Sequence, residues 1–260
     1  MTGHRPAGAP SRVLVVTAVP AERDAVLAAL RPADRTGPPA LAELPGGGVL
    51  HTVPAGPGPR TDVLAAGVGP AAAAAGTAGA LTAAALAPGP DGTAEPYGLV
   101  ICAGIGGGFP GVAPPLRAVV ASRIVAADLG AALPGGGFAP VAELGLGTGE
   151  HRPPAALDPA VAEAAGAVHA PVLTVSTATG TAGRAAELAA RFEGAAAEAM
   201  EGFGVAEAAA GHGVPVLEVR TVSNEVGPRD RAAWRIPEAL TALTGAFGRI
   251  RPVHENWSTW

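Results

Sequence analysis

Charged and amide side chains stand at the ends of apolar, β-branched segments of this chain, where they could act on a bound ligand. Glu22 lies in the turn after RVLVVTA, and Asn224 directly follows VPVLEVRTVS. Within the second segment Arg220 interrupts a run typical of a buried strand, and a buried arginine is costly unless it is paired. Glu201 precedes a helix start that two glycines weaken, which suits a backbone that approaches a ligand closely. Open α/β sheets bind ligands at such strand ends, so these four residues are candidates for a functional site.

Each of these residues also has a structural explanation. Glu22 and Glu201 could be acidic charges at helix N-termini, which the helix dipole favours. Arg220 could form an ion pair with Glu218, and that pair is compatible with a functional role. Asn224 could cap its turn with its own side chain.

Composition excludes several classes of function. The chain has 260 residues, a net charge of −5 and no basic stripe with interleaved aromatic residues, so we expect no nucleic-acid partner. Its single cysteine, Cys102, excludes a disulfide framework, and we expect a buried, inert thiol. The segment MTGHRPAGAP lacks the apolar core of a signal peptide, and no segment is apolar enough to span a bilayer. We therefore expect a cytoplasmic protein with no membrane partner.

The motifs of common cofactor and hydrolase sites are also missing. In GIGGGF, Phe109 replaces the third glycine of a dinucleotide-binding motif, and three prolines that oppose a helix follow it. There is no phosphate-binding P-loop, no serine stands in G-x-S-x-G, and the six histidines show no metal-ligand spacing. We expect neither a cofactor nor a metal.

Short β-branched runs alternate with alanine-rich helical runs along the chain. This alternation predicts an α/β sheet that helices cover on both faces, in a single domain over residues 12–250 with tails at 1–11 and 251–260. The glycine- and proline-rich segments 31–48 and 130–155 are predicted to be loops. The predicted strands are 12–18, 49–53, 61–67, 97–104, 116–128, 171–177 and 214–223, and the predicted helices are 22–30, a helix from Pro70, 182–192, 201–210 and 237–247.

Four segments, in order, resemble the nucleosidase/purine nucleoside phosphorylase superfamily, over about 13–247. They are TAVPAERDAV, AGVGPAAAAAG, VICAGIGGGF, and the pair AEAMEGFGVAEAA with VPVLEVRTVSNEVGPRD. The first, third and fourth are similar to those of methylthioadenosine/adenosylhomocysteine nucleosidases. Ser-Asn followed by Val-Gly-x-Arg-Asp resembles the futalosine hydrolases, which remove hypoxanthine from futalosine in menaquinone biosynthesis. The resemblance implies a three-layer α/β sandwich with a central mixed, twisted sheet, and a homo-oligomer.

The resemblance also implies roles in cleaving an N-ribosidic bond, which passes through an oxocarbenium-like sugar. Glu22 takes the position of the residue that activates water, and Arg220 orients that water. Glu201 accepts hydrogen bonds from the ribose hydroxyls, and Met200 packs under the sugar, although a plain core position would also suit a methionine.

Asn224 stands where adenine-releasing relatives carry an aspartate that protonates the leaving base. An amide does not titrate, but its nitrogen donates a hydrogen bond while its oxygen accepts one. Hypoxanthine and guanine carry an acceptor at position 6, whereas adenine carries a donor. Asn224 therefore complements a 6-oxopurine, and sites built on such pairing discriminate strongly.

Further residues follow from the resemblance. Gly104, Ile105 and Gly106 lie beside the sugar and offer only backbone contact, because Ile105 replaces a serine that the family often has. Thr177 and Thr179 belong to the loop that flanks the base, and the stacking phenylalanine of the family is missing there.

The 5′ group of futalosine is an aromatic carboxylate, which requires apolar walls and a cation. Trp234 lies where nucleosidases carry an aromatic residue of the 5′ pocket, and any of Arg229, Arg231 and Arg235 is placed to pair with the carboxylate. Asp230 or solvent would supply the proton of the leaving base, unless Asp230 is the N-cap of the helix that follows.

Three alternatives stay open. The chain could act on methylthioadenosine or adenosylhomocysteine, or it could be a 6-oxopurine nucleoside phosphorylase. Negative charge at Glu22 repels phosphate and favours water, whereas Arg23 keeps phosphorolysis possible. A nucleoside-binding protein without catalysis would have no reason to keep both Glu22 and Arg220. The expected partners are therefore a nucleoside substrate and water.

Overall fold

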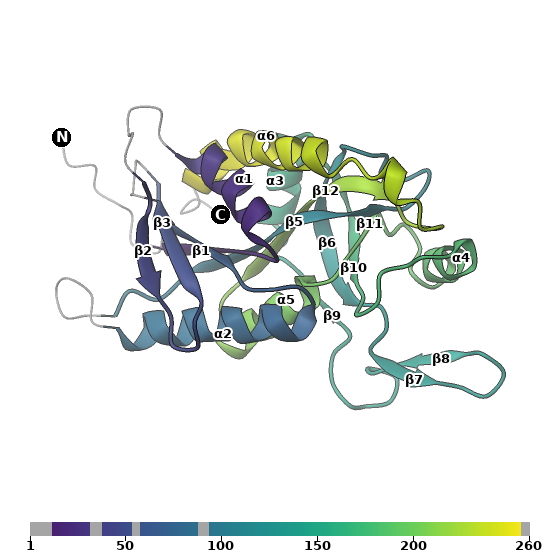
Figure 1. The fold of residues 1–260 in the computed structure, drawn as a ribbon. Helices are drawn as coiled ribbons and strands as arrows, with labels where there is room; N and C mark the ends of the chain where they lie inside the picture. Colours follow the sequence, from purple (N-terminus) through teal and green to yellow (C-terminus); the bar gives the residue numbers. More distant parts are fainter. Residues whose placement is uncertain (1–11, 32–37, 54–57, 88–93, 256–260) are drawn as a thin grey trace.

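The predicted α/β class is confirmed, and a mixed sheet lies between two layers of helices (Figure 1). The computed structural model describes residues 12–31, 38–53, 58–87 and 94–255. The predicted tail 1–11 and residues 256–260 of the other tail lie outside the described residues. Residues 251–255 belong to the last helix and not to a separate tail.

β4, β1, β5 and β12 pair in parallel, and so do β6, β10 and β11, because buried, valine-rich segments return to the sheet through helices. β6 and β12 pair in the antiparallel direction. The sheet order is β11-β10-β6-β12-β5-β1-β4-β3-β2, and β9 pairs with β6. β7 and β8 form a separate hairpin. The strands are β1 (Arg12–Thr17), β2 (Ala40–Glu43), β3 (Val49–Val53), β4 (Arg60–Ala65), β5 (Leu99–Gly108), β6 (Ala118–Ala126), β7 (Gly130–Ala132), β8 (Phe138–Pro140), β9 (Glu150–His151), β10 (Val168–Thr174), β11 (Ala197–Ala199) and β12 (Val216–Glu225).

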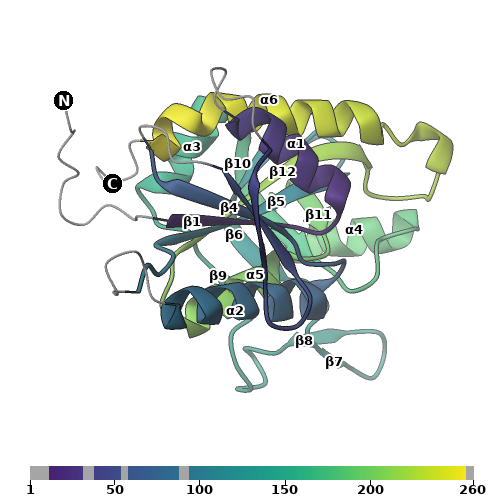
Figure 2. The ribbon, with the colours of Figure 1, turned by 60° about the vertical axis from the view of Figure 1, so that its left-hand side comes forward.

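The helices cover both faces of the sheet. α1 (Pro20–Leu30), α3 (Leu157–Ala165) and α6 (Ile236–Glu255) lie over one face, and α2 (Pro70–Leu86) and α5 (Gly202–Gly211) lie over the other (Figures 1 and 2). Each layer buries its own apolar cluster against the sheet. α4 (Ala182–Arg191) covers one end, and a short 3₁₀ helix, η1 (Arg231–Ala233), precedes α6. Of the described helices, none is long and apolar enough to cross a membrane.

β5 is the central strand of the arrangement. Its first part pairs with β1, its last residues pair with β11, and β12 pairs with it along nearly its whole length. Because β11 also pairs with β10, the strands β5, β12, β6, β10 and β11 form a closed ring of neighbours. The ring brings the ends of β5, β11 and β12 together at one end of the molecule (Figure 1).

Several boundaries differ from the prediction. The segments predicted as loops, 31–48 and 130–155, contain β2 and the short strands β7, β8 and β9. β11 and α3 lie outside all predicted elements. β5 continues through its glycines to Gly108, because pairing with β11 and β12 supplies hydrogen bonds that glycine-rich sequence alone does not indicate. α6 continues past the predicted end at 247 because Ile250 is buried against the sheet layer.

Candidate active site

Glu22 lies at the start of α1, immediately after β1, and its side chain is buried. Its Oε2 atom accepts from the backbone N–H groups of Ala18 (2.9 Å) and Val19 (3.3 Å), and Oε1 accepts from the N–H of Ile105 (2.9 Å). The structural explanation of Glu22 as an acidic residue at a helix N-terminus therefore applies in part, because its carboxylate caps α1. Burial raises the pKa of Glu22, although the nearby Arg220 charge and the Ile105 N–H oppose the rise. A carboxylate with a raised pKa is a better proton acceptor than an ordinary one.

Arg220 on β12 is fully buried and connects the acidic groups of the site. Its Nε donates to Glu218 Oε1 at 2.9 Å, and its Nη1 lies 3.2 Å from Glu201 Oε2. Its Nη2 donates to the Cys102 sulfur at 3.1 Å. The predicted pair with Glu218 thus coexists with a contact to Glu201. We call Glu22, Glu201, Glu218 and Arg220 the buried charge cluster.

Two of the groups that contact Arg220, the Glu218 carboxyl and the Cys102 thiol, are deeply buried. Glu218 Oε2 has no hydrogen-bond partner among the described residues, and burial raises the pKa of this carboxyl group. Burial likewise raises the pKa of the Cys102 thiol. Burial and this direction of the pKa shift agree with the inert thiol that we expect from the sequence.

Glu201 stands at the N-cap position of α5 and is 5% exposed. Besides Arg220, it accepts from the N–H groups of Gly69 (3.2 Å) and Met200 (3.3 Å). The Met200 side chain is partly buried and packs against an apolar cluster that includes Phe109 and Val226. The pair Met200–Glu201 is thus held where β11 ends and α5 begins.

Glycines on β5 let the site residues approach the strand. A Cβ atom at Gly104 would lie 2.5 Å from Glu22 Oε1 and 2.7 Å from Arg220 Nη1, so these two side chains meet over Gly104. A Cβ atom at Gly106 would lie 2.6 Å from the Glu198 carbonyl oxygen. The predicted backbone contact at Ile105 exists, but its N–H donates to Glu22.

Asn224 lies at the end of β12, beside Gly107 of β5. Its Oδ1 accepts from the Ser223 hydroxyl at 2.8 Å, and its Nδ2 donates to the Glu225 carbonyl at 2.9 Å. These local bonds match the turn-capping explanation. An amide has two N–H donors and an oxygen with two lone pairs, so the two bonds leave one donor and one lone pair for a ligand.

The loop after β10 carries the predicted threonines. Thr177 is exposed, whereas Thr179 donates from its N–H (2.8 Å) and its hydroxyl (2.5 Å) to the carboxylate of Glu198 on β11. Glu198 was not among the predicted residues. A glutamate between the alanines of a buried AEA strand was the available signal, because such a position normally takes an apolar side chain.

The remaining candidate residues lie in the segment after β12, and their side chains make different contacts. The Asp230 carboxylate is exposed and accepts from the Ala232 N–H at 3.0 Å. Asp230 is therefore an N-cap, as the alternative explanation predicted, and the helix that it caps is the 3₁₀ helix η1. The Arg229 guanidinium lies over the Trp234 ring at 5.8 Å, whereas Arg235 pairs with Glu238 at 3.4 Å. Arg231 is exposed. Arg229 and Trp234 are thus together, as a cation beside an aromatic surface.

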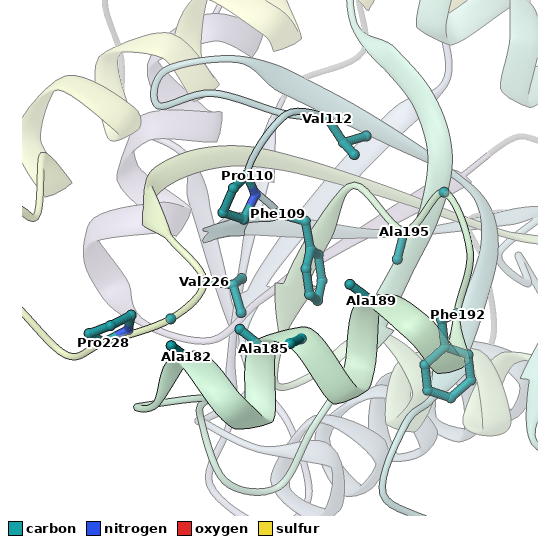
Figure 3. A pocket seen from close by; sticks show the side chains of 13 residues that line it. Phe109, Pro110, Val112, Ala182, Ala185, Ala189, Phe192, Ala195, Val226 and Pro228 are labelled. Carbon is teal, nitrogen blue, oxygen red and sulfur yellow. The ribbon is translucent and has the colours of Figure 1, made fainter.

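An apolar pocket of about 370 Å³ lies next to these segments (Figure 3). Phe109 and Val226, which directly follow β5 and β12, line one side of it, and Ala182, Ala185 and Ala189 line it from α4. Its lining has no titratable side chain, so an acid or base must come from outside this pocket, and the buried charge cluster contains such groups. In the described part of the chain, no three His, Cys, Asp or Glu side chains are grouped so that they could hold a metal ion.

The geometry combines a buried carboxylate, an arginine that two further carboxylates hold, and an asparagine at the neighbouring strand end. The carboxylate can accept a proton from water, and the other acidic groups can stabilise positive charge on a sugar. Such a site suits displacement at a carbon that develops cationic character.

Comparison with known proteins agrees with this architecture. No family model matches the chain. A futalosine hydrolase of Streptomyces coelicolor is 59% identical over 246 residues, which covers 94% of this chain and 97% of that relative. The 5′-methylthioadenosine/S-adenosylhomocysteine nucleosidase of Helicobacter pylori has the same fold, with a TM-score of 0.75 at 17% identity over 94% of this chain and 98% of that one. A solved futalosine hydrolase of Helicobacter pylori has the same TM-score, identity and coverage.

The high identity extends over almost the whole length of both proteins. The fold likeness to nucleosidases agrees with the three-layer sandwich that the resemblance implied. The chain therefore belongs to the futalosine hydrolase family, a family of nucleosidases.

Proposed function

We propose that this chain hydrolyses futalosine to hypoxanthine and dehypoxanthine futalosine, a step of menaquinone biosynthesis. The observation that carries the proposal is the 59% identity to a futalosine hydrolase over nearly the full chain. The buried charge cluster supports it, because it supplies a base, a cation and further carboxylates within one site.

In this proposal Glu22 is the general base. Water bonds to C1′ of the ribose as Glu22 takes its proton, and the bond between C1′ and the purine nitrogen breaks with its electron pair going to the base. Arg220 orients the water beside Glu22, and Glu201 accepts hydrogen bonds from the ribose hydroxyls. The contact of Arg220 with Glu201 supports a common role, because Arg220 also meets Glu22 over Gly104.

Asn224 recognises the departing base. Its remaining N–H donates to the oxygen at position 6, and its remaining lone pair accepts from N7–H as the purine leaves. The Ser223 hydroxyl fixes this amide orientation, because it donates to Oδ1. Solvent supplies the proton of the leaving base, or Asp230 does so if its exposed carboxylate gives up the cap of η1.

The 5′ carboxylate of futalosine pairs with Arg229, and its aromatic ring lies against Trp234. The position of the Arg229 guanidinium over the Trp234 ring supports this choice among the three arginines. Gly106 and Met200 lie beside the sugar, and Thr177 and Thr179 flank the base.

Hydrolysis of methylthioadenosine or adenosylhomocysteine and phosphorolysis of a 6-oxopurine nucleoside are the alternative functions. Arg23, the cation that phosphorolysis would require, pairs with Asp24 at 2.8 Å. This pair offsets the charge that would attract phosphate.

Base release from futalosine, inosine and methylthioadenosine, each with and without phosphate, tests the proposal. We expect hypoxanthine from futalosine at a rate that phosphate does not change, and little release from the other two. A strict requirement for phosphate would establish phosphorolysis, and preferred release of adenine from methylthioadenosine would establish the other nucleosidase activity.

We further propose a cytoplasmic homo-oligomer. Exposed leucines on and beside the β7–β8 hairpin support the assembly, because the hairpin projects from the body of the molecule (Figure 1) and exposed apolar patches mark interaction surfaces. They are Leu129, Leu133, Leu144 and Leu146. The molar mass in solution, measured by light scattering, tests this proposal.

A further inference from the structure

Glu198 and Asn224 lie on the two sides of Gly107, on the same face of the sheet. Glu198 on β11 pairs with Gly107 in the antiparallel direction, and Asn224 on β12 pairs with Gly107 in the parallel direction. Side chains of paired residues point to the same face. The surroundings agree, because a Cβ atom at Gly107 would lie 3.5 Å from Asn224 Nδ2, whereas one at Gly106 would contact Ala199, whose side chain points opposite to that of Glu198.

The Glu198 carboxylate is held in one orientation although it is buried. Its residue is 7% exposed, and both carboxylate oxygens accept from Thr179. Thr179 is a neutral partner, and within the described ranges Glu198 forms no salt bridge. Burying a carboxylate whose hydrogen-bond donors are neutral is costly. Burial raises the pKa of Glu198, although the bonds from Thr179 and the charge of Arg184, which pairs with Glu187 instead, oppose the rise. Such a group is more readily explained by a ligand than by stability.

The loop that holds Glu198 is also connected to the Asn224 side of the site. Thr179 binds Glu198, and the next carbonyl, that of Gly180, accepts from the Arg229 N–H at 3.2 Å. The 176–181 loop therefore bridges the end of β11 and the segment after β12. A base bound beside this loop would have Glu198 at one edge and Asn224 at the other.

We infer that Glu198 is the second residue that reads the base, and that its carboxylate accepts the N1–H of a 6-oxopurine while Asn224 contacts position 6 and N7. This inference rests on the proposed function and names a further contact of the same site. The Cα atoms of the two residues are two strand spacings apart, or about 10 Å, which leaves room for a purine with a hydrogen bond on each side. A carboxylate has two acceptor oxygens with about four lone-pair sites, so the bonds from Thr179 leave capacity for N1–H.

This contact selects against adenine. A 6-oxopurine carries a hydrogen on N1, whereas N1 of adenine is a bare acceptor. An ionised Glu198 would face that acceptor with a negative oxygen, and one buried polar group would stay unpaired. The two residues thus read three positions of the same base edge.

Futalosine and an analogue with adenine in place of hypoxanthine separate this role from a structural one. In Glu198→Gln the side chain keeps its shape but gains an amide N–H that can donate to N1 of adenine. We expect the ratio of kcat/KM for futalosine to that for the 6-amino analogue to fall about ten- to one-hundredfold, the size of a lost charged hydrogen bond. The matched comparison is Thr179→Val, which removes the hydroxyl bond but keeps the carboxylate and the bond from the backbone N–H, so it should lower both rates and change the ratio much less than Glu198→Gln does.

If Glu198 only positions the loop, Glu198→Gln will lower both rates together and leave the ratio unchanged, and the inference is overturned. Futalosine methylated on N1 gives a second measurement on the intact protein. Its rate should be at least tenfold lower than that of futalosine, and equal rates would also overturn the inference. A wild-type protein that releases no hypoxanthine from futalosine would instead refute the proposed function itself.

Discussion

Replacing Glu22 with Gln removes the proposed base. The side chain keeps its shape, and one carboxylate oxygen becomes an amide nitrogen. In the native site Oε2 accepts two backbone N–H bonds, from Ala18 and Val19, and Oε1 accepts one, from Ile105. An amide nitrogen cannot accept, so the Gln side chain must give up one side. We expect it to keep its oxygen toward Ala18 and Val19, because this orientation loses one bond instead of two.

The magnitudes follow from this geometry. One unpaired buried N–H costs about 1–3 kcal/mol, which lowers Tm by about 2–12 °C for a protein of this size. Most domains have about 5–15 kcal/mol of stability, so the variant stays folded at 25 °C. Loss of a general base lowers the rate by about 10²–10⁴-fold. A rate loss of that size therefore cannot come from unfolding.

The assay is kcat/KM for hypoxanthine release from futalosine between pH 4 and 9. Burial raises the pKa of Glu22, and the ionised form is the active one, so wild-type activity should rise with pH with a midpoint above the ordinary carboxyl value of about 4.3. Glu22→Gln should lose this acid limb, whereas Glu22→Asp, which keeps a carboxylate, should retain it at a reduced rate. Near wild-type turnover by Glu22→Gln, with the same acid limb, would refute the assignment.

Three further substitutions test the rest of the site. Glu201→Ala should abolish turnover and weaken nucleoside binding. The intact enzyme should lose most of its rate on a 2′-deoxy substrate. Equal rates on the ribose and deoxyribose substrates would show that Glu201 is not part of the site. Gly104→Ala places a Cβ atom against Glu22 and Arg220, so we expect about 1–3 kcal/mol of destabilisation and a tenfold or larger fall in kcat, and unchanged Tm and kcat would contradict this contact. Asn224→Asp should shift the kcat/KM ratio toward the 6-amino analogue of futalosine, and a constant ratio would favour the turn-capping explanation.

The sequence predicted the parts of the molecule that short-range patterns specify. Apolar runs identified the central strands, and charged residues that interrupt or end those runs indicated the site, because a buried charge needs a partner or a ligand. Glu22, Glu201 and Arg220 were identified in this way, and the structure brings the two carboxylates together around Arg220.

The features that the sequence did not predict depend on contacts between distant segments. β11 has three residues and becomes a strand because β5 and β10 flank it, so nothing in its own length or pattern indicates pairing. The position of Glu198 beside Gly107 follows from that pairing. The choice of Arg229 over Arg235 likewise depends on side-chain contacts with Trp234 and Glu238, which the spacing of three arginines in seven residues does not specify.

The buried carboxyl groups also determine how the folded protein exchanges protons with its surroundings. Burial raises the pKa of Glu22, Glu198 and Glu218, so between the unfolded carboxyl value and the raised values the native state binds more protons than the unfolded chain. The stability that these groups contribute is fully present below the unfolded pKa and is lost as the pH rises through the folded pKa. Unfolding in this window therefore releases protons, and the apparent enthalpy of unfolding will depend on the ionisation enthalpy of the buffer. A nucleoside analogue with a cationic ring in place of the ribose would favour the ionised carboxylates, so its binding would release part of the same protons without unfolding the chain.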